Sequence, residues 1–235
     1  DRVFDGASFC VEATGKLIKM GKLFTEDFFI YDTDDSSVEN SINLERSFEE
    51  EIYDALVLGI KDYCNKTGFK TVLLGLSGGI DSAIVAVLAA AAIGAENVYS
   101  VMMPSMYSSA GSVDDSVELI NNLGIKSHKI PIQPAFDTVL EHISPYFNGK
   151  LADVTEENLQ SRIRGLFLMS LANKHGHLLL TTGNKSEVAT GYATLYGDMC
   201  GGLAVIADVY KTDIYALARY INRDKTIIPD AIITK

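Results

Sequence analysis

The chain has 235 residues, of which 47% are hydrophobic and 22% are charged, and its formal net charge at pH 7 is −11. This length and composition are typical of a globular chain that buries one good core and carries at most a small appendage. The acidic balance argues against a nucleic-acid partner, because proteins that grip a phosphate backbone usually present a basic face, whereas Lys and Arg are scattered and outnumbered here.

The cysteines and the apolar stretches exclude several other classes. Cys10, Cys64 and Cys200 show no Cys-x-x-Cys spacing, so the sequence indicates neither a disulfide framework nor a zinc site. We therefore expect a reducing, cytoplasmic compartment and no signal peptide. The most apolar stretch, 83–93, has about half of the ~20 residues that span a bilayer, so we expect a buried core helix and no membrane partner.

The beginning of the chain differs from the rest. Short β-like pieces at 3–4, 8–11 and 28–31 are separated by glycines, and the polar run at 32–37 has the clustered like charge of a linker. We therefore predict a small N-terminal part over residues 1–32, a linker over 33–46 and the main domain over 47–235.

From residue 47 onward, apolar strands alternate with helical patterns. Helices are predicted at about 48–63, from 82 into the Ala-rich stretch, and at 111–123, 136–143, 155–174 (with Thr155 as its cap) and 212–221; strands are predicted at 71–76, 98–103, 128–132 and 177–182, and a short apolar piece at 204–207. Such alternation implies parallel β-α-β units with right-handed crossovers. The fold class is therefore α/β, with a Rossmann-like doubly wound parallel sheet.

The first polar motif is Ser77-Gly78-Gly79-Ile80-Asp81-Ser82, between the predicted strand at 71–76 and the Ala-rich helix. The two glycines allow a sharp turn that brings backbone N–H groups inward, and the positive end of the helix faces the same point, so the motif predicts a site for a phosphate chain. The Asp81 carboxylate suits an accompanying Mg²⁺ ion. The alternative is a capped helix start, with Asp81 or Ser82 as N-cap and no ligand.

Two common phosphate motifs are excluded at this position. The ordinary P-loop needs a Lys after its second glycine, and the dinucleotide fingerprint needs a third glycine where Ile80, Asp81 and Ser82 stand.

The second polar motif follows the predicted strand at 177–182. The segments 181–187 and 191–198 are dense in hydroxyl, amide and charged groups. Because the carboxyl ends of parallel strands meet at one edge of a sheet, we expect Ser77 and Thr182 to face one crevice, with Thr182 bonded to a nucleotide and Glu187 opposite Asp81 as a second Mg²⁺ ligand. The alternative is a surface turn followed by a helix, which would account for Asn184 and Lys185 in particular.

The motif at 77–82 resembles the signature of the N-type ATP pyrophosphatases, and further strings narrow the resemblance to the NAD synthetase family in its glutamine-dependent form. Those strings are residues 104–109, 157–165, 182–187 and 191–198, and the resemblance extends over 48–235. Residues 3–9 resemble the end of the nitrilase-like glutaminase domain that precedes the synthetase in that form.

The resemblance implies an adenine nucleotide alpha hydrolase-like fold and ATP-dependent amidation of deamido-NAD to NAD, with ammonia normally derived from glutamine. It implies ATP contacts from a set of residues that includes the first motif: Gly75, Leu76, Ser77, Gly78, Gly79, Ile80, Asp81, Ser82, Thr182 and Lys211. Among these it implies that Asp81 and Lys211 are catalytic. It also implies deamido-NAD contacts from Asn158, Arg162 and Glu187, Mg²⁺ ligation by Asp81 and Glu187, and a homodimer.

Three departures from the family pattern bear on these expectations. Leu195 replaces a substrate-contacting Lys of the ammonia-dependent branch and Gly202 replaces a later Asp, both of which we interpret as marks of the glutamine-dependent branch. The sequence also ends before a final segment expected in the family, so we expect the synthetase domain to be C-terminally incomplete.

Two rival functions and one ambiguous pair of residues stay open. An amidating enzyme such as GMP synthetase would share the first motif, and a non-catalytic nucleotide-binding module would keep it without turnover. Arg162 and Arg164 lie two positions apart on one predicted helix, so at most one of them faces the crevice.

Overall fold

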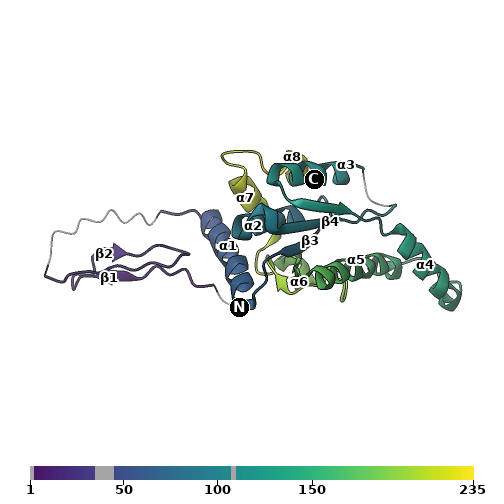
Figure 1. Ribbon diagram of the computed structural model, residues 1–235, viewed down its shortest axis with the longest axis horizontal. Coiled ribbons are helices and arrows are strands. Elements are labelled where there is room, and N and C mark those ends of the chain that lie inside the picture. Colours follow the sequence, from purple (N-terminus) through teal and green to yellow (C-terminus); the bar gives the residue numbers. More distant parts are fainter. Residues whose placement is uncertain (1–2, 35–44, 107–109) are drawn as a thin grey trace.

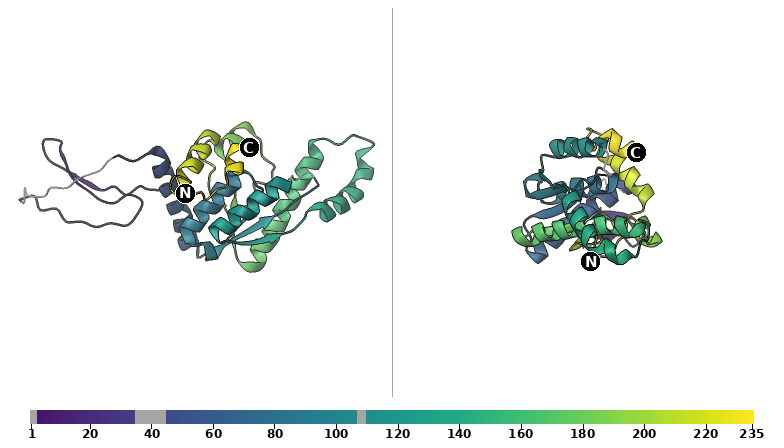
Figure 2. Two further views of the ribbon diagram at one scale, coloured as in Figure 1. Left: turned by 90° about the horizontal axis from the view of Figure 1, so that it is seen from above. Right: turned by 90° about the vertical axis from the view of Figure 1, so that its right-hand side faces the viewer.

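The structure of the protein is a computed structural model, which describes residues 3–34, 45–106 and 110–235. An α/β body is flanked by an N-terminal hairpin at one end and by a pair of helices that projects from the other end (Figures 1 and 2). The predicted linker at 33–46 and the string at 104–109 lie partly outside the described residues.

The hairpin consists of β1 (Phe9–Val11) and β2 (Leu17–Met20), which pair antiparallel. The strand predicted at 8–11 is therefore confirmed, whereas 3–4 and 28–31 are not strands and β2 was not predicted. The hairpin touches the body near α1, where Arg46 lies over the ring of Phe24 at 5.5 Å from its centroid.

The body is built on a five-stranded sheet with the order β5-β4-β3-β6-β7, and all of its pairings are parallel. Its strands are β3 (Val72–Leu76), β4 (Val98–Met102), β5 (Lys126–Lys129), β6 (Leu178–Thr181) and β7 (Leu203–Ala204). Val72 is level with both Val98 and Leu178, so β3 is the central strand. The predicted doubly wound α/β fold is confirmed.

Helices cover both faces of this sheet (Figure 1). One face carries α1 (Phe48–Thr67), α2 (Ile80–Ile93), α3 (Ala110–Leu123), α7 (Lys211–Ile221) and α8 (Asp230–Thr234). The other carries α4 (Gln133–Ile143) and α5 (Val154–His175), while the short α6 (Lys185–Thr190) follows β6. Two 3₁₀ turns, Ala95–Asn97 and Ser144–Phe147, complete the elements.

The inner strands β3, β4 and β6 have apolar residues on both sides, as a sheet covered on two faces requires, whereas the edge strand β5 has the sequence Lys-Ser-His-Lys. Val72 and Leu74 of β3 belong to the core under α2, and Leu73 belongs to the core under α5. Helix α2 is apolar around its whole circumference and is buried from Ser82 to Ala89. Full burial of one Leu or Ile side chain contributes about 1.5–3 kcal/mol, so this helix fixes the position of the loop that precedes it.

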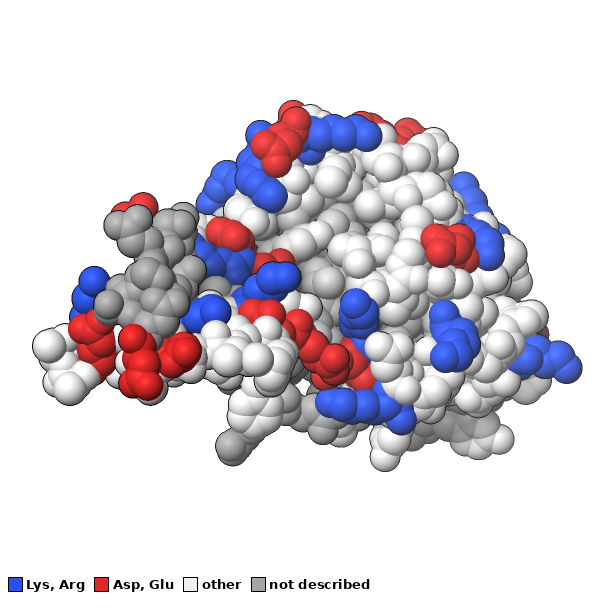
Figure 3. All heavy atoms as spheres, turned by 60° about the vertical axis from the view of Figure 1, so that its left-hand side comes forward, with Lys and Arg blue, Asp and Glu red and all other residues white. Residues whose placement is uncertain are grey.

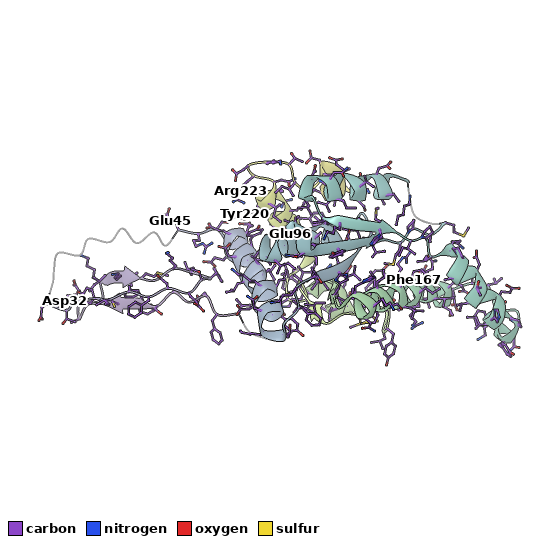
Figure 4. The ribbon with its side chains drawn as sticks, viewed as in Figure 1. Asp32, Glu45, Glu96, Phe167, Tyr220 and Arg223 are labelled. Carbon is purple, nitrogen blue, oxygen red and sulfur yellow. The ribbon has the colours of Figure 1, made fainter. Side chains whose placement is uncertain are left out.

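The ends of α1 and α7 are joined by aromatic contacts. Tyr220 of α7 lies 6.0 Å from Tyr53 of α1, and the guanidinium of Arg223 lies 3.9 Å from the centroid of the Tyr220 ring (Figure 4). These contacts hold α7, whose opposite end carries Lys211.

Several elements differ from prediction: α4 begins three residues before the predicted 136, α1 runs past the predicted 63 to Thr67, and α6 and α8 were not among the predicted helices. Helix α5 begins at Val154 because the Asp153 carboxylate accepts the Thr155 N–H at 2.8 Å, so Asp153 is the cap and not Thr155. Helix α2 begins at Ile80, two residues before the predicted start. Strand β5 ends at Lys129, three residues before the predicted 132, because the chain leaves the sheet to start α4 at Gln133.

Among the described residues, no helix is both long and apolar enough to cross a membrane.

Candidate active site

The candidate site lies where the chain direction reverses in the sheet. After β3 the chain moves to β4 and β5 on one side, and it later returns to β6 and β7 on the other. Loops that follow adjacent strands on the two sides of such a switch point diverge and leave a crevice at the carboxyl ends of the strands. The segments that begin at Ser77 and Thr182 both lie at this crevice and line the same cavity, as the sequence predicted.

The loop after β3 is braced by its own hydroxyl groups. Ser82 is buried, accepts the Ser77 N–H at 3.3 Å and donates to the Gly79 carbonyl at 3.0 Å. The Gly79 N–H in turn donates to the Ser77 hydroxyl at 3.2 Å. Ser82 thus stabilises the turn, and its predicted contact with ATP stays a prediction. No side chain caps α2, so the N–H groups of its first turn stay available to an anion.

Gly78 shows why this loop needs a glycine. Its φ is +77°, and a Cβ atom added here would lie within 2.8 Å of the Cα of Ser112 in α3. A larger residue would therefore be strained and would also clash with the start of α3.

The carboxylate of Asp81 joins three segments that are distant in sequence. One oxygen forms an ion pair with Lys211 at the start of α7, and the other accepts the side-chain N–H of Asn184 at 2.9 Å. Asn184 precedes α6, and its backbone N–H donates to Glu187 Oε2 at 3.0 Å while its side-chain oxygen accepts the Glu187 N–H at 3.0 Å. The structure therefore brings Asp81, Glu187 and Lys211 together, as predicted.

The start of α6 ties the N-termini of α2 and α7 to the network formed by Asp81, Asn184, Glu187 and Lys211. Ser186 accepts the Lys211 N–H at 3.1 Å, and the Lys185 N–H donates to the Val209 carbonyl at 2.9 Å. The positive ends of α2 and α7 thus converge on the same point as the Lys211 ammonium group, which is an arrangement that favours a bound anion.

The electrostatics of Glu187 reflect this crowding. Burial raises the pKa of Glu187, the Asn184 N–H bond lowers it, and the nearby Asp81 carboxylate raises it again. A cation placed between Glu187 and Asp81 would favour the charged form of both groups.

An apolar cavity of about 220 Å³ lies next to this network. Its walls come from the ends of β3, β4 and β6 and from α3, α5 and the 197–200 turn: Gly75, Leu76, Ser77, Met102, Met103, Pro104, Ser112, Val113, Ser116, Ser161, Arg164, Gly165, Leu168, Leu180, Thr181, Thr182, Gly197, Asp198 and Cys200. Burial lowers the pKa of Arg164, whose Nε donates to the Met103 carbonyl at 3.3 Å. Arg164, and not Arg162, lines this cavity.

A second cavity of about 270 Å³ lies on the other side of the segment 181–183. Glu187, Tyr192 and Gly202 are among its walls, and it shares Thr181 and Asp198 with the first cavity. Of the predicted site residues, Gly75, Leu76, Ser77 and Thr182 line the first cavity and Glu187 lines the second, whereas residues 78–82 and Lys211 line neither.

Asn158 and Arg162 lie beside these cavities without lining either of them. The Asn158 side chain accepts the Thr194 hydroxyl at 2.9 Å, and Arg162 Nε donates to the Leu195 carbonyl at 3.2 Å. Both residues thus hold the 194–198 turn, whose Asp198 faces both cavities. Their predicted contacts with deamido-NAD stay predictions.

Sequence reasoning missed three residues of the site: Arg164, Asp198 and the linking role of Asn184. The pattern Asn184-x-x-Glu187 is a capping box, which was a usable signal for a helix that starts at residue 185. No sequence signal separates Arg164 from Arg162, because the two share one helix and one motif.

Comparisons with known proteins agree with this geometry. The family model described as NAD synthase matches residues 52–235. A glutamine-dependent NAD(+) synthetase from Synechocystis is 51% identical over 100% of this chain, which covers 43% of that protein.

Two solved structures are similar in fold as well. That of glutamine-dependent NAD+ synthetase from Acinetobacter baumannii, in complex with ADP, is 44% identical with a TM-score of 0.95 and covers 99% of this chain and 45% of that one. That of NH3-dependent NAD synthetase from Campylobacter jejuni is 32% identical with a TM-score of 0.72 and covers 80% and 78%.

The chain thus spans less than half the length of the glutamine-dependent relatives that it resembles. The family model, in contrast, covers most of the chain and includes the whole sheet and both cavities. The chain belongs to the NAD synthase family.

Proposed function

We propose that this chain is the synthetase part of a glutamine-dependent NAD synthetase, which amidates deamido-NAD to NAD with ATP and ammonia and releases AMP and pyrophosphate. The observation that carries the proposal is the Asp81 network. It brings a carboxylate and the Lys211 ammonium group to the N-termini of α2 and α7, and the loops that lead into it from Ser77 and Thr182 line an apolar cavity.

The ATP molecule would lie with its adenosine in the first cavity and its phosphates toward α2. Gly75, Ser77 and Thr182 line that cavity, and the loop at 78–82 continues from its wall to the uncapped start of α2. The Acinetobacter baumannii relative, solved in complex with ADP, supports an adenine nucleotide as the ligand, since 99% of this chain aligns with that structure.

The residues present fit a Mg²⁺ ion that is shared with the phosphates. Mg²⁺ in such sites is held by one or two carboxylates together with phosphate oxygens and water, and Asp81 and Glu187 share Asn184 as a common partner. No cluster of three or more His, Cys, Asp or Glu suited to a metal occurs in the part of the chain that the structure describes. The ion would neutralise charge on the phosphates when bound.

The chemistry needs activation because the nicotinate carboxylate is a poor electrophile. The carboxylate attacks the α-phosphorus of ATP, the bond to the leaving pyrophosphate breaks, and an acyl adenylate forms. Ammonia then attacks the acyl carbon, AMP leaves with the former carboxylate oxygen, and a proton is released. The α2 N–H groups and Lys211 would stabilise the charge on the departing pyrophosphate, and the two cavities would hold the reactants in place.

The second cavity is the proposed place for the reacting end of deamido-NAD. It adjoins the first cavity at Thr181 and Asp198, and Glu187 lines it. Asn158 and Arg162 would act from the neighbouring turn, which they hold by hydrogen bonds.

Three further parts of the proposal concern partners. Residues 1–32 would be the end of a glutaminase domain that supplies ammonia, with 33–46 as the linker to the synthetase domain at 47–235. The exposed aromatic residues of the N-terminal part, Phe4 at 79% and Phe28 at 85% exposure, are suited to contact that domain. A homodimer of synthetase domains is the proposed assembly.

The charge distribution is compatible with small anionic substrates. On the face drawn in Figure 3, Lys and Arg alternate with Asp and Glu and do not merge into one basic surface. The Lys211 ammonium group forms an ion pair with Asp81, and the uncapped N-terminus of α2 adds its partial positive charge at the same place.

The test is NAD formation from deamido-NAD, ATP and ammonium salts by this chain, with Mg²⁺ present. Formation of NAD with one AMP per NAD supports the proposal. ATP binding without turnover would instead support a non-catalytic nucleotide-binding module. A rise in melting temperature with XMP and ATP, but not with deamido-NAD and ATP, would support the amidating activity of a GMP synthetase.

A further inference from the structure

Asn184 lies between the two carboxylates of the site and is completely buried, with an exposed fraction of 0%. Its side-chain nitrogen donates to Asp81 Oδ1 at 2.9 Å, and its side-chain oxygen accepts the Glu187 N–H at 3.0 Å. Its backbone N–H donates to Glu187 Oε2 at 3.0 Å. The residue therefore contacts both predicted metal ligands.

Capping of α6 does not by itself require asparagine. An N-cap residue needs only a side-chain acceptor, and Ser, Thr and Asp serve about as well as Asn. The donor N–H₂ group of Asn184 is superfluous for the cap, but it is the part that reaches Asp81. The requirement for an amide at this position thus comes from Asp81, which belongs to a segment more than a hundred residues away.

The two partners of Asp81 differ in freedom and charge. Lys211 has a long, charged side chain that is 36% exposed, so it can turn from Asp81 to an arriving phosphate. Asn184 is neutral, is buried and is fixed by its bonds to Glu187. When an anion competes for Lys211, Asn184 keeps its bond to Asp81.

We propose that Asn184 is a positioning residue that fixes one oxygen of Asp81 and so aims the other oxygen at the ligand. This inference rests on the proposed function, because the ligand concerned is ATP. It assigns a role in the reaction to a residue whose position is otherwise explained by the cap of α6.

The test compares two variants at the site with a matched variant elsewhere. Asn184→Ser keeps an acceptor for the α6 cap but is too short to reach Asp81, and Asn184→Asp keeps the cap and replaces the donor by a carboxyl group. Asp153→Ser shortens the equivalent residue in the capping box of α5, which is exposed and does not line either cavity. It controls for loss of a cap alone.

Turnover and binding are both measured. Residues that orient a metal-binding carboxylate typically change metal affinity or activity by about 10–100-fold, so we expect kcat of Asn184→Ser to fall by that factor. We expect the affinity of Asn184→Ser for adenosine to stay unchanged. The factor by which ATP with Mg²⁺ binds more tightly than adenosine should shrink about tenfold, by the same reasoning. Asp153→Ser should lower the melting temperature without either effect.

The pH dependence of Asn184→Asp provides a readout that a purely structural role would not change. The introduced carboxyl group faces Asp81, with Lys211 and Glu187 nearby, and like charges at this distance favour its protonated form. A protonated carboxyl group donates to Asp81 as the amide does. The activity of Asn184→Asp relative to the unaltered chain should therefore rise as the pH falls, whereas that of Asn184→Ser stays a constant fraction.

The outcomes separate this inference from the proposed function. If the unaltered chain makes no NAD but binds ATP with Mg²⁺ more tightly than adenosine, the binding series still decides the role of Asn184, and only the proposed function fails. The positioning role alone would be overturned if both Asn184 variants kept the kcat of the unaltered chain and the same ratio of affinities for ATP with Mg²⁺ and for adenosine. Losses of kcat and of relative ATP affinity no larger than those of Asp153→Ser would overturn the positioning role as well. If the unaltered chain bound ATP with Mg²⁺ no more tightly than adenosine, both the positioning role and the proposed function would be overturned.

Discussion

Removal of the Asp81 carboxylate should abolish catalysis while the fold survives. In Asp81→Ala the side-chain N–H of Asn184 loses its acceptor in a fully buried position, which costs about 1–3 kcal/mol. Lys211 is 36% exposed and regains water, so the lost ion pair adds at most about 1 kcal/mol. For a chain of this size each kcal/mol lowers the melting temperature by about 2–4 °C, so the variant stays folded at room temperature.

The loss of activity should be far larger than this loss of stability. One preorganised electrostatic group at a reacting centre is worth about 10²–10³-fold in rate, so exchange of labelled pyrophosphate into ATP, in the presence of deamido-NAD and Mg²⁺, should fall by at least that factor.

Asp81→Asn separates charge from packing. It preserves the shape of the side chain and one acceptor for Asn184, so the free energy of unfolding should change by less than about 1 kcal/mol. Its exchange rate should nevertheless fall as far as that of Asp81→Ala. Full exchange activity in either folded variant would refute the role assigned to the carboxylate.

Three further predictions concern the loop after β3, the start of β6 and the first cavity. Gly78→Ala forces an L-residue to φ +77° against the backbone of α3 and should destabilise the protein by at least ~2 kcal/mol in urea unfolding, more than Gly176→Ala, which has a similar φ but open space around it. The pKa of His177 is lowered by burial and by the charges of His175 and Lys126, so the folded state prefers the neutral form of this residue. The stability that His177 contributes is therefore complete above its ordinary pKa of about 6.5 and is lost as the pH falls through that value. His177→Phe should flatten the fall in melting temperature between about pH 7.5 and 5.5. Arg164→Met should raise the KM for ATP more than Arg162→Met does, because only Arg164 lines the first cavity; the reverse order would show that this cavity does not hold the adenosine.

The sequence predicted those parts of the site in which the chemistry and the local structure coincide. A run of buried residues followed by Gly78 and Gly79 indicates a strand, a turn and a helix start at once, and the structure has all three. The crevice between Ser77 and Thr182 followed from the parallel arrangement of the strands, since their carboxyl ends share one edge.

The rest depends on contacts between distant segments, which no local pattern encodes. The Asn184 side chain is explained equally well by a surface turn until Asp81 is seen beside it. The choice between Arg162 and Arg164 depends on the rotation of α5 against β3 and β6, and periodicity gives this angle too coarsely for residues two apart. The Ser82 hydroxyl also bonds within the tight turn, which the motif does not predict, and its contact with ATP stays a prediction.

The charges at the site explain why the backbone has to take part in binding. Asp81 and Lys211 neutralise each other, and the Lys185 ammonium group lies 3.8 Å from the Asp208 carboxylate. Among the described side chains of this network, Glu187 is therefore a carboxylate without a charged partner, and neither lysine is unpaired. In a chain with a net charge of −11, the side chains of this network therefore offer no net positive charge to a polyanion such as ATP, and Arg164 in the wall of the first cavity is the side-chain cation that the cavity contributes. The N–H groups at the uncapped start of α2 are a fixed positive end, and they carry no formal charge that has to be matched when no anion is bound. Under the proposed function, Asp81 and Glu187 would hold a Mg²⁺ ion that neutralises phosphate charge, and Lys211 would leave Asp81 for the phosphate chain, so binding of metal and nucleotide would be coupled through Asp81.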